Sequence, residues 1–253
     1  MNKIDKLLNQ KQQNILSVYF TAGYPELNST TKIIEDLENC GTDLIEVGIP
    51  FSDPIADGPV IQYSNNAAIE NGITLELIFK QLEQISAISK IPKIMMGYFN
   101  PVLKFGVEQF CEKCVKVGID GVIIPDLPLT EYKSQYQQIF KSYGIHFIFL
   151  VSPQTSKQRL CEIESLSTAF IYAVSTNSTT GGAVDFSKQK SYFSFLKKHI
   201  SKPFLIGFGV KDRQSFASAC SFANGAIIGS AFIKALFEKK DVKKFIQELT
   251  LEK

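Results

Sequence analysis

The sequence of 253 residues contains no tryptophan and only two histidines, and no apolar run approaches the ~20 residues needed to cross a bilayer. The first 14 residues are too polar for a signal peptide. The formal net charge is only +2, and no basic cluster is interleaved with aromatic residues, as it would be in many nucleic-acid-binding proteins. These absences argue against a membrane protein, a secreted protein and a nucleic-acid-binding protein. We expect the protein to remain in the compartment where it is made.

The cysteines give little sign of chemistry. The chain has five cysteines, and an odd number in a chain of this size favours free thiols in a reducing compartment. Cys111 and Cys114 form a CxxC pair, but both fall on one face of a predicted helix. Redox or metal chemistry is the alternative, yet no second cysteine or histidine pair completes a site. We therefore interpret the pair as packing residues and predict no metal site. His146 begins an apolar strand and His199 ends a polar helix, so neither is an obvious catalyst.

Short apolar runs alternate with segments of helical period along the whole chain, which is typical of a parallel sheet covered by helices. The predicted strands are 15–22, 43–49, 93–99, 121–127, 146–152, 169–175, 203–209 and 225–230. The predicted helices between them are 28–40, 74–89, 106–117, 130–143, 155–166, 188–199, 212–222 and a last one from about 231 onward.

Eight such units favour an α/β fold of the (β/α)8 TIM-barrel type over an open sheet. No Gly-, Ser- or Pro-rich linker divides the chain, so we predict a single domain over 1–253. We also predict an N-terminal helix and an extra short helix near 60–70, after the second strand. The segment 176–186, TNSTTGGAVDF, is polar and contains glycine, as a mobile lid would.

Glu46 and Asp57 are the strongest catalytic candidates. Glu46 interrupts an otherwise apolar strand, and strand alternation places it on the face of Leu44 and Gly48, toward the barrel interior. A carboxyl group there should have a raised pKa and could exchange protons near neutral pH, whereas Asp57, in a proline-stiffened loop, should stay ionised. The alternatives are a buried ion pair for Glu46 and a turn-forming role for Asp57. Tyr172 could be a proton donor, although a core aromatic is the more ordinary role.

Two glycine turns predict a phosphate site. The segments 207–209 (GFG) and 227–230 (IIGS) place glycines where the seventh and eighth strands end and helices begin, so a phosphate could approach backbone N–H groups. Each turn alone could serve turn geometry only. Such a site needs no lysine, so Lys211 need not be a ligand.

The segment 44–62, LIEVGIPFSDPIADGPVIQ, resembles the signature of the tryptophan synthase alpha chain family. The resemblance extends over nearly the whole chain through YFTAGYP (19–25), MGYFNP (96–101), IIPDLP (123–128), GFGV (207–210) and GSA (229–231). It implies a lyase that cleaves indole-3-glycerol phosphate to indole and glyceraldehyde 3-phosphate, with no cofactor in this chain.

The resemblance also implies residue roles. Glu46 matches the general acid/base, and Asp57 matches the carboxylate that pairs with the indole N–H. The positions that match substrate-binding residues are Phe20, Tyr172, Thr180, Gly181, Phe208, Gly209, Gly229 and Ser230. The chain departs from the family in its lid, where Ser178 replaces a glycine of the usual Gly-Val-Thr-Gly run, while Thr180 and Gly181 are retained.

The family further implies a partner, a beta chain that carries pyridoxal phosphate, in an α2β2 assembly. The matching surface would be formed by Pro50, Asp53, Asn100 and Asp126. Two other hypotheses remain: another phosphate-binding barrel enzyme, which would need a lysine or a cysteine/aspartate pair at strand ends, and a non-catalytic barrel that binds a partner. The lysine-rich basic set, with only two arginines, indicates an A/T-rich genome, so we expect a cytoplasmic protein or, if plastid-encoded, one of the plastid stroma.

Overall fold

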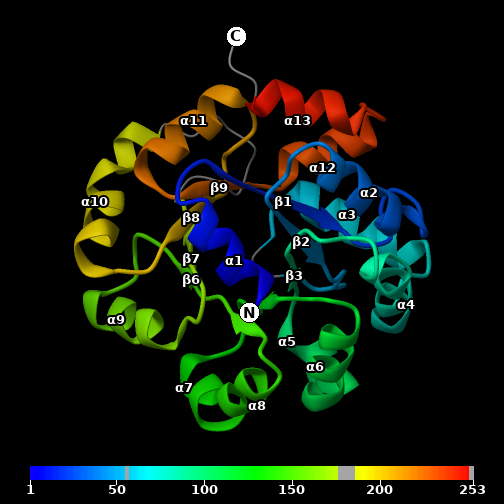
Figure 1. Ribbon diagram of the computed structural model, residues 1–253, viewed down its shortest axis with the longest axis horizontal. Helices are drawn as coiled ribbons and strands as arrows, with labels where there is room; N and C mark the ends of the chain where they lie inside the picture. The colour runs from blue at the N-terminus through cyan, green and yellow to red at the C-terminus, as the bar shows by residue number, and fades with distance from the viewer. Residues whose placement is uncertain (55–56, 176–185, 251–253) are drawn as a thin grey trace.

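The computed structural model describes residues 1–54, 57–175 and 186–250. Its centre is one parallel sheet curled into a barrel, with helices arranged around the outside (Figure 1). The strand order is β5-β4-β3-β2-β1-β9-β8-β7-β6, so the last strand pairs with the first. The described strands are β1 Ile15–Thr21, β2 Leu44–Gly48, β3 Lys93–Met96, β4 Gly121–Ile123, β5 His146–Phe147, β6 Leu150–Val151, β7 Ile171–Val174, β8 Phe204–Gly207 and β9 Gly225–Ile228. The predicted (β/α)8 barrel is confirmed.

The predicted fifth strand is divided into two short pieces, β5 and β6. Among the described strands, β5 pairs with β4 alone and β6 pairs with β7 alone. Between them, the Ile148 N–H donates to the Val122 carbonyl at 3.0 Å, and the Phe149 carbonyl accepts from the Tyr172 N–H at 3.0 Å. One stretch of chain therefore bonds to both neighbours in turn, and the chain itself completes the ring of strands.

The helices largely follow the predicted segments, and their bounds are α1 Lys3–Gln10, α2 Ser29–Asn39, α3 Pro59–Glu70, α4 Leu75–Ser86, α5 Phe99–Phe105, α6 Val107–Lys116, α7 Leu129–Glu131, α8 Gln137–Ser142, α9 Lys157–Leu166, α10 Lys190–His199, α11 Arg213–Phe222, α12 Ser230–Phe237 and α13 Val242–Thr250. α3 is the expected extra helix after β2. α5 was not predicted, because its residues continue the apolar run of β3. The predicted helix 130–143 contains a π-helical turn, Tyr132–Tyr136, between α7 and α8.

Local sequence signals explain several helix starts. The Thr74 side chain accepts a hydrogen bond from the Leu77 N–H at the start of α4. Asp212 and Ser215 form a reciprocal capping box at the start of α11. α3 begins at Pro59, whose fixed φ suits a first helical position. These signals fix where the three helices begin, and so they also fix where the loops before them end.

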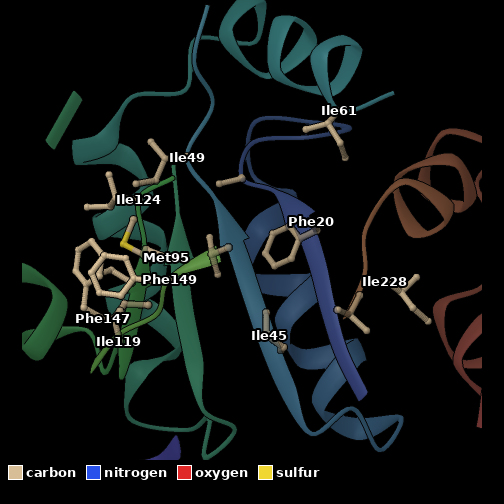
Figure 2. Close-up of a cluster of buried hydrophobic side chains, with 14 of the residues drawn as sticks. Phe20, Ile45, Ile49, Ile61, Met95, Ile119, Ile124, Phe147, Phe149 and Ile228 are labelled. Carbon is tan, nitrogen blue, oxygen red and sulfur yellow. The ribbon is translucent and has the colours of Figure 1, made fainter. Parts of the chain in front are cut away.

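The buried hydrophobic side chains form two layers. The outer layer lies between the strands and the helices and includes Phe20, Ile45 and Ile228, which Figure 2 shows among the side chains of this cluster. The inner layer fills the barrel interior and includes Leu44 and Ile94. Burial of apolar surface on both sides of every strand is the main stabilising term of such a fold.

Helix α1 closes the amino-terminal end of the barrel and lies in front of its centre in Figure 1. The Asn2 side-chain amide donates to the Asp120 carbonyl at 2.8 Å, just before β4 begins, and Ile4 packs fully buried in the inner layer. Helix α1 thus lies opposite the carboxyl-terminal ends of the strands, where the working face of such barrels lies. None of the described helices is both long and apolar enough to cross a membrane.

Candidate active site

Glu46 points into the barrel, as strand alternation predicts. Its strand neighbours Ile45 and Val47 belong to the outer layer, whereas Leu44 belongs to the inner layer. Glu46 is fully buried, and its Oε1 accepts a 2.7 Å hydrogen bond from the Ser17 hydroxyl. Its Oε2 has no hydrogen-bond partner among the described residues. Burial raises the pKa of Glu46 to about 7, although the Ser17 hydrogen bond lowers it in part. The group can therefore gain and lose a proton near neutral pH.

Asp57 lies in the loop between β2 and α3. The Tyr98 hydroxyl donates to its Oδ2 at 3.3 Å. Burial raises the pKa of Asp57, while hydrogen bonds from the side chains of Tyr98 and Asn65 lower it. Those donors favour the ionised carboxylate, which is the form expected for a fixed negative charge. Burial therefore raises the pKa of both carboxyl groups, but Glu46 is stabilised in its charged form by the side chain of Ser17, and Asp57 by two side chains, Tyr98 and Asn65.

A cavity of about 190 Å³ opens at the carboxyl-terminal ends of the strands. It is lined by Tyr19, Asp57, Ile61, Met96, Tyr172, Phe208, Gly209, Val210, Lys211, Ile227, Gly229, Ser230, Ala231 and Lys234. The rings of Tyr172 and Phe208 are 6.1 Å apart and inclined by 68°. The cavity has an aromatic middle, with Asp57 and the two predicted glycine turns in its wall.

Phe20 is not brought to the cavity, and Tyr19 lines it instead. Phe20 is fully buried in the outer layer between strands and helices. Successive side chains on a strand face opposite sides, and Ser17, on the same face as Tyr19, contacts Glu46 inside the barrel. The predicted pocket residue was therefore wrong by one position. The strand alternation that predicted the orientation of Glu46 also predicts that Tyr19, and not Phe20, faces the barrel interior.

Two glycines make room for the phenol rings. A Cβ atom added at Gly48 would lie 2.2 Å from the Tyr19 hydroxyl oxygen, and one added at Gly207 would lie 2.2 Å from the Tyr172 hydroxyl oxygen. Both distances are far below van der Waals contact. The tyrosines therefore keep their positions only because these strand residues have no side chain.

We expect Gly207→Ala to lower kcat/KM by about 100-fold, because a shift of Tyr172 by about 1 Å would misplace the substrate. Steady-state kinetics would measure the loss, with circular dichroism to show that the variant is folded. A folded variant with the wild-type kcat/KM would show that the position of Tyr172 does not matter.

The part of the cavity wall that contains the two glycine turns has the features of a phosphate site. Phe208 and Gly209 both have positive φ, 69° and 79°, and Gly229 precedes the first turn of α12. The first N–H groups of a helix have no partner within it and can bind an anion. Lys234 lies one helical turn after Ser230 and also lines the cavity. It was not predicted as a site residue from the sequence. The i, i+4 spacing of Ser230 and Lys234 on a helix that begins at a glycine turn was the available signal.

Thr180 and Gly181, and Ser178 of the predicted lid, lie outside the described residues. Cys111 and Cys114 are fully buried on α6, and burial raises the pKa of both thiols, that of Cys111 to about 12. Protonated, enclosed thiols are inert, in keeping with a packing role.

The four expected interface residues lie at the same end of the barrel. Asp53, Asn100 and Asp126 are exposed and Pro50 is half-buried. The Asp126 carboxylate accepts the Phe99 N–H, at 2.9 Å to Oδ1 and 3.1 Å to Oδ2, and so joins the loop after β4 to the start of α5.

An aromatic stack connects this surface to the cavity. The rings of Phe51 and Tyr98 are stacked with their centres 5.0 Å apart, and Tyr98 also bonds Asp57. Tyr98 therefore contacts both Phe51, next to the expected interface residue Pro50, and Asp57, a candidate catalytic carboxylate.

A parallel barrel, a buried carboxyl group of near-neutral pKa and a cavity ending in two glycine turns define an α/β-barrel enzyme that acts on a small molecule. Residues 6–252 match the sequence profile of the family described as "Tryptophan synthase alpha chain". The chain belongs to this family.

Relatives of the same description share nearly half of the sequence. The tryptophan synthase alpha chain of Flavobacterium psychrophilum is 49% identical over 253 residues, covering 98% of this chain and 100% of the relative. That of Bacteroides thetaiotaomicron is 47% identical over 251 residues and covers 98% of each chain.

Solved structures agree with the sequence comparison. Tryptophan synthase subunit alpha of Legionella pneumophila superposes with a TM-score of 0.90 at 31% identity, over 98% of this chain and 97% of that one. A chain of the tryptophan synthase complex of Pyrococcus furiosus has a TM-score of 0.86 at 33% identity, over 94% of this chain and 98% of that one. The chain is thus a lyase of tryptophan biosynthesis: the alpha subunit cleaves indole-3-glycerol phosphate, and the beta chain makes tryptophan.

Proposed function

We propose that Glu46 is the general acid/base of indole-3-glycerol phosphate cleavage and that Asp57 stabilises the charge that develops on the indole ring. The observation that carries this proposal is the environment of Glu46, a fully buried carboxyl group whose pKa burial raises to about 7. Its charge acts on Tyr19 and Tyr172, which line the cavity at the carboxyl-terminal ends of the strands. The experiment that tests it is indole release from indole-3-glycerol phosphate by the wild type and by Glu46→Gln.

The chemistry follows from the two carboxyl environments. Protonated Glu46 donates its proton to indole C3, which leaves positive charge shared with the ring nitrogen. Asp57 accepts the indole N–H and stabilises this charge more than it stabilises the neutral substrate. The Glu46 carboxylate then takes the proton of the adjacent glycerol hydroxyl. The C–C bond breaks, its electron pair restores the aromatic indole, the hydroxyl carbon becomes the aldehyde, and Glu46 is again protonated.

The other residues of the cavity would hold the two ends of the substrate. Tyr19, Tyr172 and Phe208 would enclose the indole and glycerol parts. Gly209, Gly229 and Ser230 would bind the phosphate through backbone N–H groups and the Ser230 hydroxyl, with Lys234 as a countercharge. The resemblance adds Thr180 and Gly181 to this end of the site.

We expect Lys234→Met to raise the KM for indole-3-glycerol phosphate by about 10-fold with little change in kcat, because a charged contact to the unreactive phosphate serves substrate and transition state equally. Steady-state kinetics would measure both constants. Lys198→Met, on the exposed face of α10, is the matched control with the same loss of charge. Equal KM values for Lys234→Met and the control would remove Lys234 from the site.

We propose one domain over residues 1–253, acting in the cytoplasm with a beta chain that carries pyridoxal phosphate. The alpha chain itself would need no cofactor. Bacterial relatives and five free cysteines support this setting. The surface of Pro50, Asp53, Asn100 and Asp126 would bind the beta chain in an α2β2 assembly, as its position beside the Phe51–Tyr98 stack suggests.

We expect a mixture of the two chains to sediment as a heterotetramer. Asp53→Lys with Asn100→Lys should weaken that assembly, because one charge in the interface would be reversed and a second would be added and desolvated. Analytical ultracentrifugation would measure the masses. An alpha chain that remains monomeric with its cognate beta chain would count against the assembly.

A further inference from the structure

Ser17 and Glu46 form an isolated polar pair inside an apolar barrel. Both side chains are fully buried, and the Ser17 hydroxyl donates to Oε1 of Glu46 at 2.7 Å. In the β1–β2 register Tyr19 is level with Glu46, whereas Ser17 is level with Leu44, nearer the closed amino-terminal end. Ser17 therefore holds the carboxyl group from the amino-terminal side of the barrel, away from the cavity.

We propose that Ser17 is a positioning residue for the reaction: its hydroxyl fixes one oxygen of the Glu46 carboxyl group and leaves the other oxygen to exchange protons with the substrate. This inference rests on the acid/base role proposed for Glu46. Oε2, the oxygen assigned to exchange, is buried and has no hydrogen-bond partner among the described residues. An unpaired polar atom in an apolar interior destabilises the folded protein, so its presence calls for an explanation, and a catalytic role is one.

The hydroxyl also sets the acidity of the carboxyl group. Burial raises the pKa of Glu46 to about 7, and the Ser17 hydrogen bond acts in the opposite direction. Two titratable groups that interact with the Glu46 carboxyl group are the phenols of Tyr19 on β1 and Tyr172 on β7, and both also interact with the charge of Asp57. Burial raises the pKa of both phenols, so they stay neutral near pH 7. Ser17 is therefore the neighbour through which the chain favours the charged form of Glu46.

The test compares Ser17→Ala with Ser17→Thr, which keeps a hydroxyl at the same place. Loss of one hydrogen bond to a carboxylate should raise the pKa of Glu46 by about one unit. We expect the alkaline limb of the kcat/KM profile, where protonated Glu46 is lost, to move to higher pH by that amount in Ser17→Ala and to stay near the wild-type position in Ser17→Thr.

A second readout separates this proposal from the role of Glu46 itself. The carbon-13 resonance of the Glu46 side-chain carboxyl group, assigned by its absence in Glu46→Gln, reports the same titration without turnover. A resonance that titrates at the wild-type pH in Ser17→Ala would overturn the inference about Ser17. A shifted titration with an unshifted kcat/KM profile would support the contact but overturn Glu46 as the acid/base.

Ser167→Ala is the matched control for a purely structural effect. Ser167 is also buried, and its hydroxyl donates to the Phe170 carbonyl at 2.8 Å. Its loss should lower stability by a similar amount and leave the pH profile in place. An equal shift of the profile in Ser167→Ala would mean that loss of a buried hydroxyl, and not the contact to Glu46, moves the profile.

Discussion

Glu46→Gln is expected to lower the rate of indole release from indole-3-glycerol phosphate by about 10²- to 10⁴-fold, the usual contribution of a general acid/base. Glutamine has nearly the same volume and can still accept the hydrogen bond of Ser17, but it cannot exchange a proton. The loss should appear in kcat with little change in KM, since proton transfer occurs only in the transition state. Unchanged turnover would remove Glu46 from the mechanism.

The same variant should be more stable than the wild type at alkaline pH. The pKa of Glu46 rises from its ordinary value of 4.5 to about 7 in the folded protein. The folded state therefore holds an extra proton between these values, and its free energy of unfolding falls as pH rises through this window. Ionisation of buried Glu46 lowers the free energy of unfolding by about 3 kcal/mol above pH 8 and has no effect below pH 4, since each unit of pKa difference corresponds to about 1.36 kcal/mol.

Urea denaturation of both proteins at pH 5 and pH 8 would measure this difference. The gain in stability of Glu46→Gln should be larger at pH 8 than at pH 5. An equal gain at both pH values would mean that Glu46 titrates normally in the folded protein. Activity lost together with stability gained would indicate a residue kept for function.

Asp57→Asn is expected to lower kcat by about 10²- to 10³-fold, because a neutral amide cannot stabilise the positive charge on the indole ring. The amide is close in size to the carboxylate and can still accept from Tyr98, so the geometry should be preserved. Indole release under saturating substrate would measure the effect. Binding of the neutral ground-state ring should change less than kcat.

Two variants serve as controls for Asp57→Asn. Asp36→Asn removes a carboxylate of the surface pair with Lys32 on α2 and should leave kcat unchanged. Tyr98→Phe removes the 3.3 Å hydrogen bond to Asp57 but leaves the charge of Asp57 in place, and should cause a smaller loss. If Asp57→Asn lost no more activity than Tyr98→Phe, the charge of Asp57 would not be what matters.

Glu46 shows how much of the site was accessible from the sequence. Its inward orientation followed from period-two alternation, and its raised pKa followed from apolar neighbours on one strand. The barrel followed from eight repeats of an apolar run and a helical segment. These are local patterns, so one sequence is enough to recognise them.

Tyr19 and Lys234 were missed for different reasons. Phe20 was chosen over Tyr19 because it matches an apolar pocket position of the family, although alternation with Ser17 assigns it to the helix-facing layer. Lys234 was missed because its place in the cavity depends on how α12 leaves β9. The break between β5 and β6 has the same origin, since it depends on pairing with strands distant in the chain.

The pairing of β1 with β9 has a consequence for synthesis of the chain. It joins residues 15–18 to residues 225–228. Closing so long a segment is entropically slow, and it requires nearly the whole polypeptide to have left the ribosome. Glu46 and Asp57 belong to the half that emerges first, whereas Gly209, Gly229 and Lys234 emerge late. A nascent chain would therefore carry the proposed acid/base long before it carries the residues proposed to bind the phosphate. The two ends of the proposed site would come together only when β1 pairs with β9.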